Sequence, residues 1–528
     1  MESFEMTTTR YTRRGFLATT AGAAGSLALS GLAGGPALAQ APRVLRSRLF
    51  VPLENLDPMT RTSAAEGDVM DGLFPGLITY KPGTEWGWEL DAAAALEMVD
   101  ATHIRFALKP GLGWTNGFGE LTAEDVKFSY ERIADPANKS AYRGDWEPLD
   151  SVQVTGPREG VIVLKRPFMP LMSSTMPMQS GMIVCKKAVE ALEGKRFGLE
   201  PPAVAGPYKP APGGTRMAMT LVRNEGWTGP RPLFDELRFI AITDANAAEV
   251  AYQAGEIDLT QLPMTAIPRF RARPPAGSKL VVRPALAYWW LGMQMEEGVF
   301  ADKRVRQAVQ YALDVEEVLQ GAFFGVAERS TGVIAPGLIG ARTRNLIEKP
   351  DLAKAKALLA EAGHPNGFKT DIKVRNSAEF VNVAQVVAAS LAKVGIQAEV
   401  IPLDAAVNRL YTTGPKGEWK QMAMYVARFS MNPDPSWGTA WFTREQIGKW
   451  NSSRFASAEF DELNTKALSE TDPAKRHQMY VRMQDLMEES GAHIFLTHGS
   501  AGILHRASFV PALSPDANRM QARKFTLA

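Results

Sequence analysis

The chain has 528 residues, of which 45% are hydrophobic and 22% are charged, and its formal net charge is +2. This composition is that of an ordinary globular protein, and the length predicts two or three domains. No sustained run of Lys or Arg is present, which argues against nucleic acid as a partner. The single cysteine, Cys185, excludes an internal disulfide and a CxxC metal or redox site.

The first segment has the pattern of an export signal. Paired arginines, Arg13 and Arg14, precede a weakly apolar stretch and a small-residue site at 37–39. This order predicts a twin-arginine signal peptide over 1–39, cut after the last of these residues, and a periplasmic mature protein. A membrane anchor is the alternative, but the stretch is rich in Gly and Ala and is broken by Gly-Gly-Pro at 34–36.

Strand and helix signals alternate along the rest of the chain. N-cap residues predict helices that begin after Thr122, Asp302, Asp351 and Asp472. The clearest unit is a strand over 370–374, a helix over 380–395 and a strand over 396–401, a spacing typical of a parallel βαβ crossover. A further buried strand is predicted over 421–427. Stretches rich in Pro and Gly at 81–88, 200–214 and 271–279 indicate boundaries.

Common catalytic motifs are missing. The sequence contains no GxSxG, no HExxH and no Gly-rich phosphate loop, and its six histidines are scattered. His493 and His498 are five residues apart in a predicted strand, so they point to opposite faces. We therefore expect no catalytic residues, no metal site and no cofactor, although distant residues can still assemble a triad.

Three adjacent aromatic residues, Tyr288, Trp289 and Trp290, occupy a predicted strand. Alternation sends Trp289 to one face and the other two to the opposite face. Two interpretations remain open: both faces are covered by core, or one face lines a large aromatic pocket for an organic ligand.

The segment "RFSMNPDPSW", Arg428 to Trp437, follows the predicted strand over 421–427. Asn, Pro and Asp are turn residues, so a simple turn is one interpretation. The cation, the carboxylate and the tryptophan make a ligand-binding corner the other.

Several stretches together resemble the family 5 extracellular solute-binding proteins, the receptors of peptide/nickel-type ABC importers. They occur in the family order and are "NLDPMTRTSAAEGDVMDGLFPGLITY", "FALKPGLGWTNGFGELTAEDVKFSYERIADP", "VAGPYKP", "FADKRVRQAVQYALDVEEVL", "DLAKAKALLAEAG" and "KWNSSRFASAEFDELNTKAL". The resemblance covers nearly the whole mature chain.

The resemblance implies an α/β, two-lobed periplasmic binding protein fold of class II with an extra domain on lobe one. Lobe one is expected from 43–80, 205–295 and 490–528, the extra domain from 81–204, and lobe two from 296–489. The crossings near 295 and 490 are expected to form a hinge that closes the lobes over the ligand.

The resemblance also implies the function and the site. We expect a monomeric, non-enzymatic receptor that captures a small peptide-like or amino-acid-derived solute and delivers it to ABC permease subunits. A nickel or metal-chelate receptor and an exported hydrolase are the alternatives. The residues expected to face the ligand are Thr62, Ser63, Ala64, Tyr288, Trp289, Trp290, Arg428, Met431, Asp434 and Trp437.

The chain departs from peptide-binding relatives at this corner. An alignment on Asp434 and the proline after it places Met431 where those receptors have an aspartate for the peptide ammonium, and Arg428 where they have a tryptophan. An ammonium buried without a counter-charge costs several kcal/mol, whereas a guanidinium pairs with a carboxylate. The expected solute is therefore carboxylated, or peptide-like with a blocked amino terminus.

Overall fold

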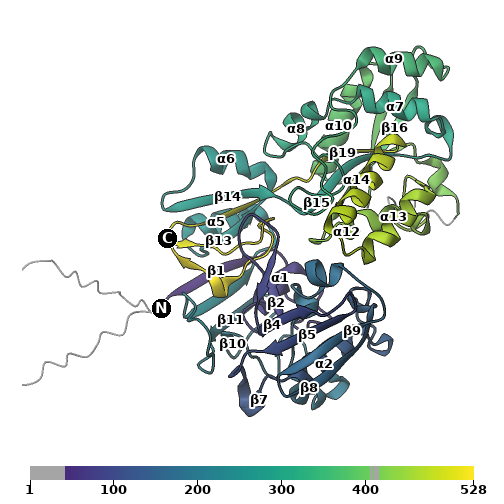
Figure 1. Ribbon diagram of the computed structural model, residues 1–528. Coiled ribbons are helices and arrows are strands. Elements are labelled where there is room, and N and C mark those ends of the chain that lie inside the picture. The colour runs from purple at the N-terminus through teal and green to yellow at the C-terminus, as the bar shows by residue number, and fades with distance from the viewer. Residues whose placement is uncertain (1–41, 405–406, 408, 410–415) are drawn as a thin grey trace, which may run out of the picture. The chain divides into compact units, whose positions relative to one another are not determined.

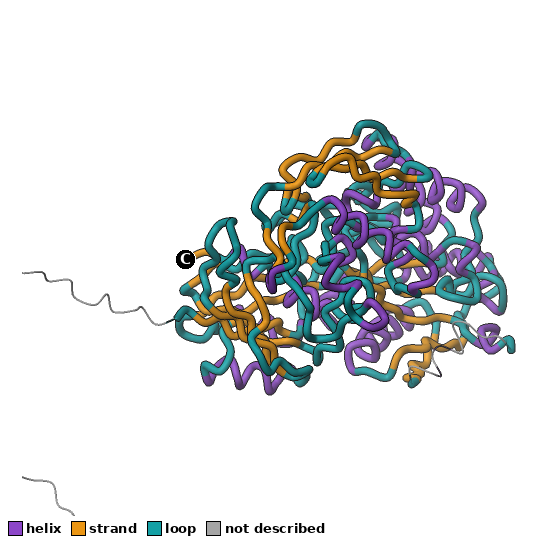
Figure 2. Tube along the Cα trace, turned by 90° about the horizontal axis from the view of Figure 1, so that it is seen from below, coloured by secondary structure: helices purple, strands orange, loops and turns teal. Residues whose placement is uncertain are grey.

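The computed structural model describes residues 42–404, 407, 409 and 416–528. The predicted signal segment lies outside these residues. The part from Pro42 to Ala528 is one compact unit in which helices, strands and loops alternate (Figure 2).

The first sheet has seven strands in the order β10-β11-β12-β1-β13-β20-β14. Strand β1 is parallel to β12 and β13, and β20 is antiparallel to β13 and β14. The strands are β1 (Val44–Leu49), β10 (Tyr208–Pro210), β11 (Ala218–Arg223), β12 (Glu236–Ala241), β13 (Leu259–Leu262), β14 (Ser278–Pro284) and β20 (Ser500–Arg506). The helices associated with this sheet are α1 (Ala64–Met70), α5 (Ala245–Ala254) and α6 (Ile267–Ala272).

The second sheet has five strands in the order β17-β16-β18-β15-β19. They are β15 (Ala287–Met293), β16 (Lys369–Arg375), β17 (Gln397–Leu403), β18 (Met424–Ser430) and β19 (His493–Thr497). Strands β16 and β17 are parallel and joined through α10 (Ala378–Ala392), which confirms the predicted βαβ crossover. The predicted strand over 421–427 is β18, displaced toward the C-terminus, so that Arg428 belongs to the strand itself.

Helices cover both faces of the second sheet (Figure 1). Trp289 and Leu291 share one core with α7 (Lys303–Ala312), α8 (Val315–Phe323), α9 (Leu352–Glu361) and α10. Tyr288 and Trp290 share another with α13 (Ala458–Ser469) and α14 (Pro473–Glu489). Every residue of β15 is therefore buried. A short helix, α12 (Ser436–Thr439), follows the corner after β18.

A four-stranded antiparallel sheet, in the order β4-β5-β9-β8, lies within the expected extra domain. Its strands are β4 (Ala93–Met98), β5 (His103–Leu108), β8 (Leu149–Gly156) and β9 (Glu159–Leu164), accompanied by α2 (Ala123–Ala134), α3 (Arg143–Trp146) and α4 (Lys186–Glu190). The short strands are β2 (Ile78–Tyr80), β3 (Trp88–Leu90), β6 (Gly113–Trp114), β7 (Gly119–Glu120), β21 (Phe509–Val510) and β22 (Thr526–Leu527).

The chain passes between the two large sheets at 284–287 and again at 497–500. The expected crossings near 295 and 490 differ from these positions, because β15 and β19 both pair within the second sheet. The aromatic strand β15 is an interior strand of the second sheet, between β18 and β19, where cover on both faces suits its continuous apolar sequence.

Local capping signals are confirmed. Thr122 and Asp125 form a reciprocal capping box at α2. The carboxylates of Asp302, Asp351 and Asp472 accept backbone N–H groups at the starts of α7, α9 and α14. These caps are readable from sequence because both partners lie within one helical turn.

Candidate functional site

The carboxyl ends of β16 and β18 lie side by side, because the two strands are parallel neighbours. Arg375 is the last residue of β16, and α10 begins three residues later. Arg428 is near the end of β18. In open α/β sheets, the region outside the carboxyl ends of the strands is where ligands bind, so this edge is the first candidate site.

Two arginine side chains occupy this edge; both residues are exposed overall, and the Arg428 guanidinium is partly desolvated. The Arg428 Cζ lies 5.9 Å from the centre of the Trp289 ring, and the Arg375 Cζ lies 5.7 Å from that of Phe380. Among the described residues, neither side chain makes a hydrogen bond or an ion pair with another group. Both cations therefore remain available to an anion.

One carboxylate, that of Glu379, stands near this pair. Desolvation is the main cause of the lowered pKa of Arg428. The charge of Arg375 lowers this pKa further, and the carboxylate of Glu379 opposes both effects. Desolvation also raises the pKa of Glu379, an effect that Arg428 opposes. With two cations and one carboxylate, the edge keeps a net positive charge and favours a ligand with a negative group.

The Asp434 carboxylate is occupied by hydrogen bonds from other groups of the protein. Its side chain is fully buried and accepts hydrogen bonds from Arg476 Nη2 at 2.9 and 3.0 Å and from Ser436 N at 3.0 Å. The hydroxyls of Ser436 and Ser173 each donate to it at 2.6 Å. Because Ser173 lies within the expected extra domain, this carboxylate joins three distant segments of the chain. Its bonds use the acceptor capacity of a carboxylate.

The remaining residues of the corner are packed differently. Met431 is buried, and its N–H donates to Leu286 O at 2.8 Å. Trp437 is partly buried and meets Trp441 edge to face at 5.8 Å. Trp441 in turn contacts Trp450, whose side chain is 46% exposed. Partly exposed aromatic rings thus continue from the corner to the surface, a contact area suited to an organic ligand.

The three strand aromatics lie inside the two cores, with exposures of 0% for Tyr288 and Trp289 and 1% for Trp290. Trp289 packs against Phe323 and Phe380. Tyr288 and Trp290 pack against Phe442 on the other face. The interpretation in which both faces are core accounts for this burial, and ligand contact by these rings stays a prediction.

The segment Thr62–Ala64 forms the start of α1. Ser63 is the N-cap and forms a capping box with Glu66. The N–H groups of Thr62 and Ser63 donate to the Glu66 carboxylate at 2.6 and 2.9 Å. Thr62 is exposed, and its hydroxyl lies 3.4 Å from Glu66 Oε1, so ligand contact by this residue stays a prediction.

Sequence reasoning missed four residues of these arrangements: Arg375, Glu379, Ser173 and Arg476. The first two were open to prediction, because they stand at the junction of the predicted strand and the predicted helix of the βαβ unit. Ser173 and Arg476 were not, because their partner, Asp434, is distant in sequence.

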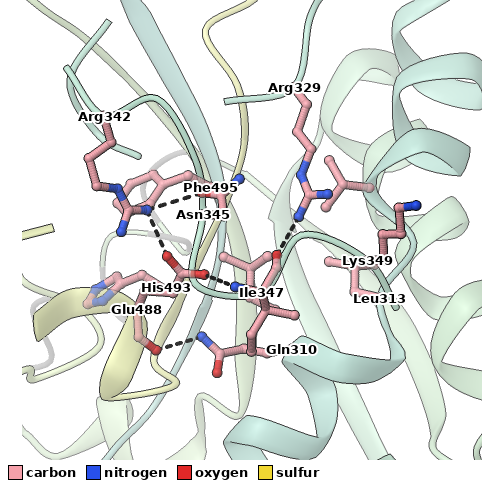
Figure 3. Close-up of a pocket in the computed structure, with 12 residues that line it drawn as sticks. Gln310, Leu313, Arg329, Arg342, Asn345, Ile347, Lys349, Glu488, His493 and Phe495 are labelled. Atoms are coloured by element: carbon pink, nitrogen blue, oxygen red, sulfur yellow. Dashed lines mark hydrogen bonds and ion pairs between the residues drawn. The ribbon is translucent and has the colours of Figure 1, made fainter. Parts of the chain in front are cut away.

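A small cavity beside β19 is too small for an organic solute. It measures about 30 Å³, and Gln310, Leu313, Arg329 and His493 are among its lining residues (Figure 3). This volume suits one or two water molecules. Burial lowers the pKa of His493 to about 3, so its imidazole is neutral at pH 7.

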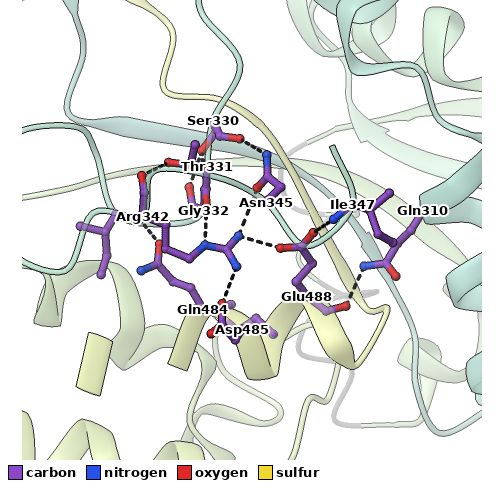
Figure 4. A network of polar contacts seen from close by, with 12 residues as sticks. Gln310, Ser330, Thr331, Gly332, Arg342, Asn345, Ile347, Gln484, Asp485 and Glu488 are labelled. Atoms are coloured by element: carbon purple, nitrogen blue, oxygen red, sulfur yellow. Dashed lines mark hydrogen bonds and ion pairs between the residues drawn. The ribbon is translucent and has the colours of Figure 1, made fainter. Parts of the chain in front are cut away.

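A buried network next to this cavity holds the 330–347 segment on α14 (Figure 4). Arg342 donates to Thr331 O at 2.6 Å, to Asp485 at 2.9 Å and to Glu488 at 2.7 Å. Its charge is met by two carboxylates, so this guanidinium is structural and differs from Arg375 and Arg428.

Comparison with known proteins identifies the family. The sequence model of "Bacterial extracellular solute-binding proteins, family 5 Middle" matches residues 89–450. The chain belongs to this family. It is therefore a solute-binding component of ABC import, with the two-lobed α/β fold of that family.

Relatives and solved structures agree with this assignment. The glutathione-binding protein GsiB of Shigella flexneri serotype 5b is 25% identical over 391 residues, which is 72% of this chain and 74% of the relative. HbpA2 from Haemophilus parasuis has a TM-score of 0.80 at 21% identity, over 92% of this chain and 100% of that chain. DppA from Helicobacter pylori, in complex with peptide STSA, has a TM-score of 0.71 at 22% identity, over 92% and 98%.

Two features are absent from the residues that the structure describes. None of the helices in the described part of the chain combines the length and apolar character needed to cross a bilayer. Within the same residues, no group of three or more His, Cys, Asp or Glu side chains is placed to hold a metal ion.

Proposed function

We propose that this protein is the exported receptor for a small carboxylated organic solute, peptide-like or amino-acid-derived, which it delivers to an ABC permease without chemical turnover. The observation that carries the proposal is the pair of guanidiniums, Arg375 and Arg428, at the carboxyl edge of the second sheet, which make no ion pair with the residues that the structure describes. The partly exposed aromatic rings of Trp437, Trp441 and Trp450 would accommodate the organic part of the solute.

The ion pair between Asp434 and Arg476 disfavours solutes with a free amino group. An ammonium group entering a closed cleft needs a counter-charge, and this carboxylate already pairs with Arg476. A free peptide amino terminus therefore lacks an obvious partner at the corner, where Met431 is apolar. A blocked or modified peptide, or another solute whose carboxylate is its main charged group, fits better.

The names of the relatives support a peptide-like class. GsiB is described as glutathione-binding, and DppA was solved with a peptide. We propose further that residues 1–39 direct export by the twin-arginine route, that the mature chain acts in the periplasm, and that it works as a monomer.

Calorimetry with matched ligands tests the proposed charge preference. Mature protein would be titrated with glutathione, with N-acetylated dipeptides and with the C-terminal amides of the same dipeptides. We expect the carboxylate forms to bind one to one and the amides to bind at least about tenfold more weakly, because a charge-assisted hydrogen bond contributes about 1.5–3 kcal/mol.

Arg428→Ala provides the residue-level test. It should weaken binding of the carboxylate ligands by about tenfold or more and leave the amides nearly unchanged. Arg344→Ala is the matched control, since Arg344 is an exposed arginine of the 330–347 segment, which is held on α14. Equal losses from the two variants, or an unchanged preference for the carboxylate, would remove Arg428 from the site.

A further inference from the structure

A separate pocket lies where the chain passes between the two sheets. It measures about 170 Å³, and its walls include Arg271 of α6, Arg283 of β14, Glu328 and Arg329 after α8, and the crossing residues Gly499 and Ser500. None of the residues at the edge of β16 and β18 lines it. We call this pocket the crossing pocket.

The crossing pocket is rich in positive charge. Three of its lining residues are arginines, and Glu328 is the carboxylate among those described. Arg271 is exposed and makes no hydrogen bond or ion pair with a described residue. Even when Asp516, which acts on Arg283 from outside the lining, is counted with Glu328, two carboxylates face three guanidiniums, so the pocket keeps a net positive charge.

The other two arginines are held by carbonyl oxygens. Arg283 donates to Ser514 O at 2.7 Å and also to Gly83 O. Arg329 donates to Ile347 O at 2.8 Å and also to Glu348 O (Figure 3). Its Nε is buried and has no partner among the described residues. In the part of the chain that the structure describes, neither guanidinium has an ion pair like those around Arg342. For Arg283, desolvation lowers the pKa and the nearby Asp516 carboxylate partly opposes this.

A buried donor lies behind the crossing residue Gly499, although Trp289 is not itself among the residues that line the pocket. Gly499 has a φ of +74°, and a Cβ placed there would lie 3.7 Å from Trp289 Nε1. This indole N–H is fully buried and lacks a partner among the described residues. A buried donor without a partner is uncommon in folded proteins and calls for a ligand or a water molecule.

The neighbouring histidine brings no negative charge and no free donor. His498 Nδ1 lies 2.7 Å from Ala287 O, and its Nε2 lies 3.0 Å from Ser330 Oγ. Burial lowers its pKa to about 4, so the ring is neutral at pH 7. With Nδ1–H donating to the carbonyl, Nε2 is the acceptor nitrogen and faces the Ser330 hydroxyl, which also donates to Gly332 O.

We propose that the crossing pocket binds a small oxyanion, such as inorganic phosphate, sulfate or a free carboxylate, and that Arg271 and Arg329 contact it from opposite walls. Guanidinium groups match the geometry of these anions. The pocket draws its walls from α6 and β14 beside the first sheet and from the segment after α8, so the bound anion would link these parts of the chain at the crossing. This site is distinct from the proposed solute site and does not depend on it.

The test is a calorimetric titration of the mature protein with sodium phosphate at pH 7, with sodium sulfate and sodium acetate as parallel arms and ionic strength held constant by NaCl. The wild-type protein should bind one phosphate saturably. Arg271→Gln should raise the phosphate Kd about fivefold or more, as expected for loss of a charge-assisted contact. Glu328→Gln should lower it, because it removes the carboxylate from the wall.

Two controls make the outcome decisive. Arg273→Gln removes the same charge from an exposed residue two positions away that does not line the pocket, and should leave the Kd unchanged. Arg428→Ala should also leave it unchanged. No saturable binding of any of the three anions, or equal losses from Arg271→Gln and Arg273→Gln, would overturn the proposal. Loss of phosphate binding in Arg428→Ala alone would overturn it too, and would place the anion at the proposed solute site.

Discussion

The buried pair between Asp434 and Arg476 gives the most quantitative prediction. The substitution Asp434→Asn keeps the shape of the side chain and removes its charge. It leaves the Arg476 guanidinium, whose side chain is 5% exposed, without its counter-charge. Breaking a buried ion pair from one side costs about 3–5 kcal/mol, because an uncompensated charge stays inside the protein.

Local contacts of Arg476 do not replace the lost carboxylate. Its Nε donates to Ala467 O at 2.8 Å and its Nη2 approaches the Tyr480 hydroxyl at 3.4 Å, both neutral groups. We therefore expect Asp434→Asn to lose about 3–5 kcal/mol of unfolding free energy. The double variant Asp434→Leu/Arg476→Met should recover much of this loss, because no charge is left buried.

Urea unfolding followed by tryptophan fluorescence measures the effect, since several tryptophans lie in the same half of the protein. Glu462→Gln is the surface control: it breaks the exposed i,i+4 pair with Lys466, 2.5 Å apart, and should cost less than about 0.5 kcal/mol. A loss below about 1 kcal/mol for Asp434→Asn, the range of an exposed pair, would refute the view that this carboxylate is a structural anchor.

Three further predictions concern the core and its pH dependence. Trp290→Ala should lose about 3–5 kcal/mol in urea unfolding, because it empties a fully buried site; a loss near zero would indicate a ring that faces solvent or ligand. Gly340→Ala should lower the melting temperature measured by calorimetry, because φ is +83° and the new Cβ would lie 2.3 Å from Tyr480 Cβ; an unchanged value would contradict this geometry. His493→Phe should gain stability relative to the wild type as the pH falls from about 6.5 toward 3. The fold lowers the pKa of His493 from 6.5 to about 3, so the wild type keeps this contribution above pH 6.5 and loses it on acidification, whereas the variant has nothing to titrate. The unfolding free energies of both proteins would be measured in urea at each pH. A difference between them that stays constant from pH 6.5 to 3 would contradict this prediction.

Features set by short-range interactions could be predicted from the sequence. The caps at Asp302, Asp351 and Asp472, and the βαβ unit around α10, depend on residues a few positions apart. The crossings could not be placed, because an apolar strand gives no sign of which sheet it joins. Strand β15 lies in the second sheet because β18 and β19, more than a hundred residues later, pair with it.

For the candidate site, too, the sequence identifies individual residues but not the roles that distant partners give them. The cation at Arg428 and the polar corner at Asp434 were visible in the sequence, but their roles depend on distant partners. Arg476 fixes Asp434 as an ion-paired anchor, and Arg375 doubles the positive charge beside Arg428. The burial of Trp289 and Trp290 likewise depends on helices from both sides of the sheet.

Native mass spectrometry of the mature protein, purified from its own host without denaturation, tests the central claim most directly. The account predicts one small anionic molecule per chain in the wild type and its loss from the Arg375→Ala/Arg428→Ala variant, with the Arg344→Ala variant retaining it. Equal occupancy of that molecule in the double variant and the wild type would contradict the assignment of the solute site to this edge of the second sheet.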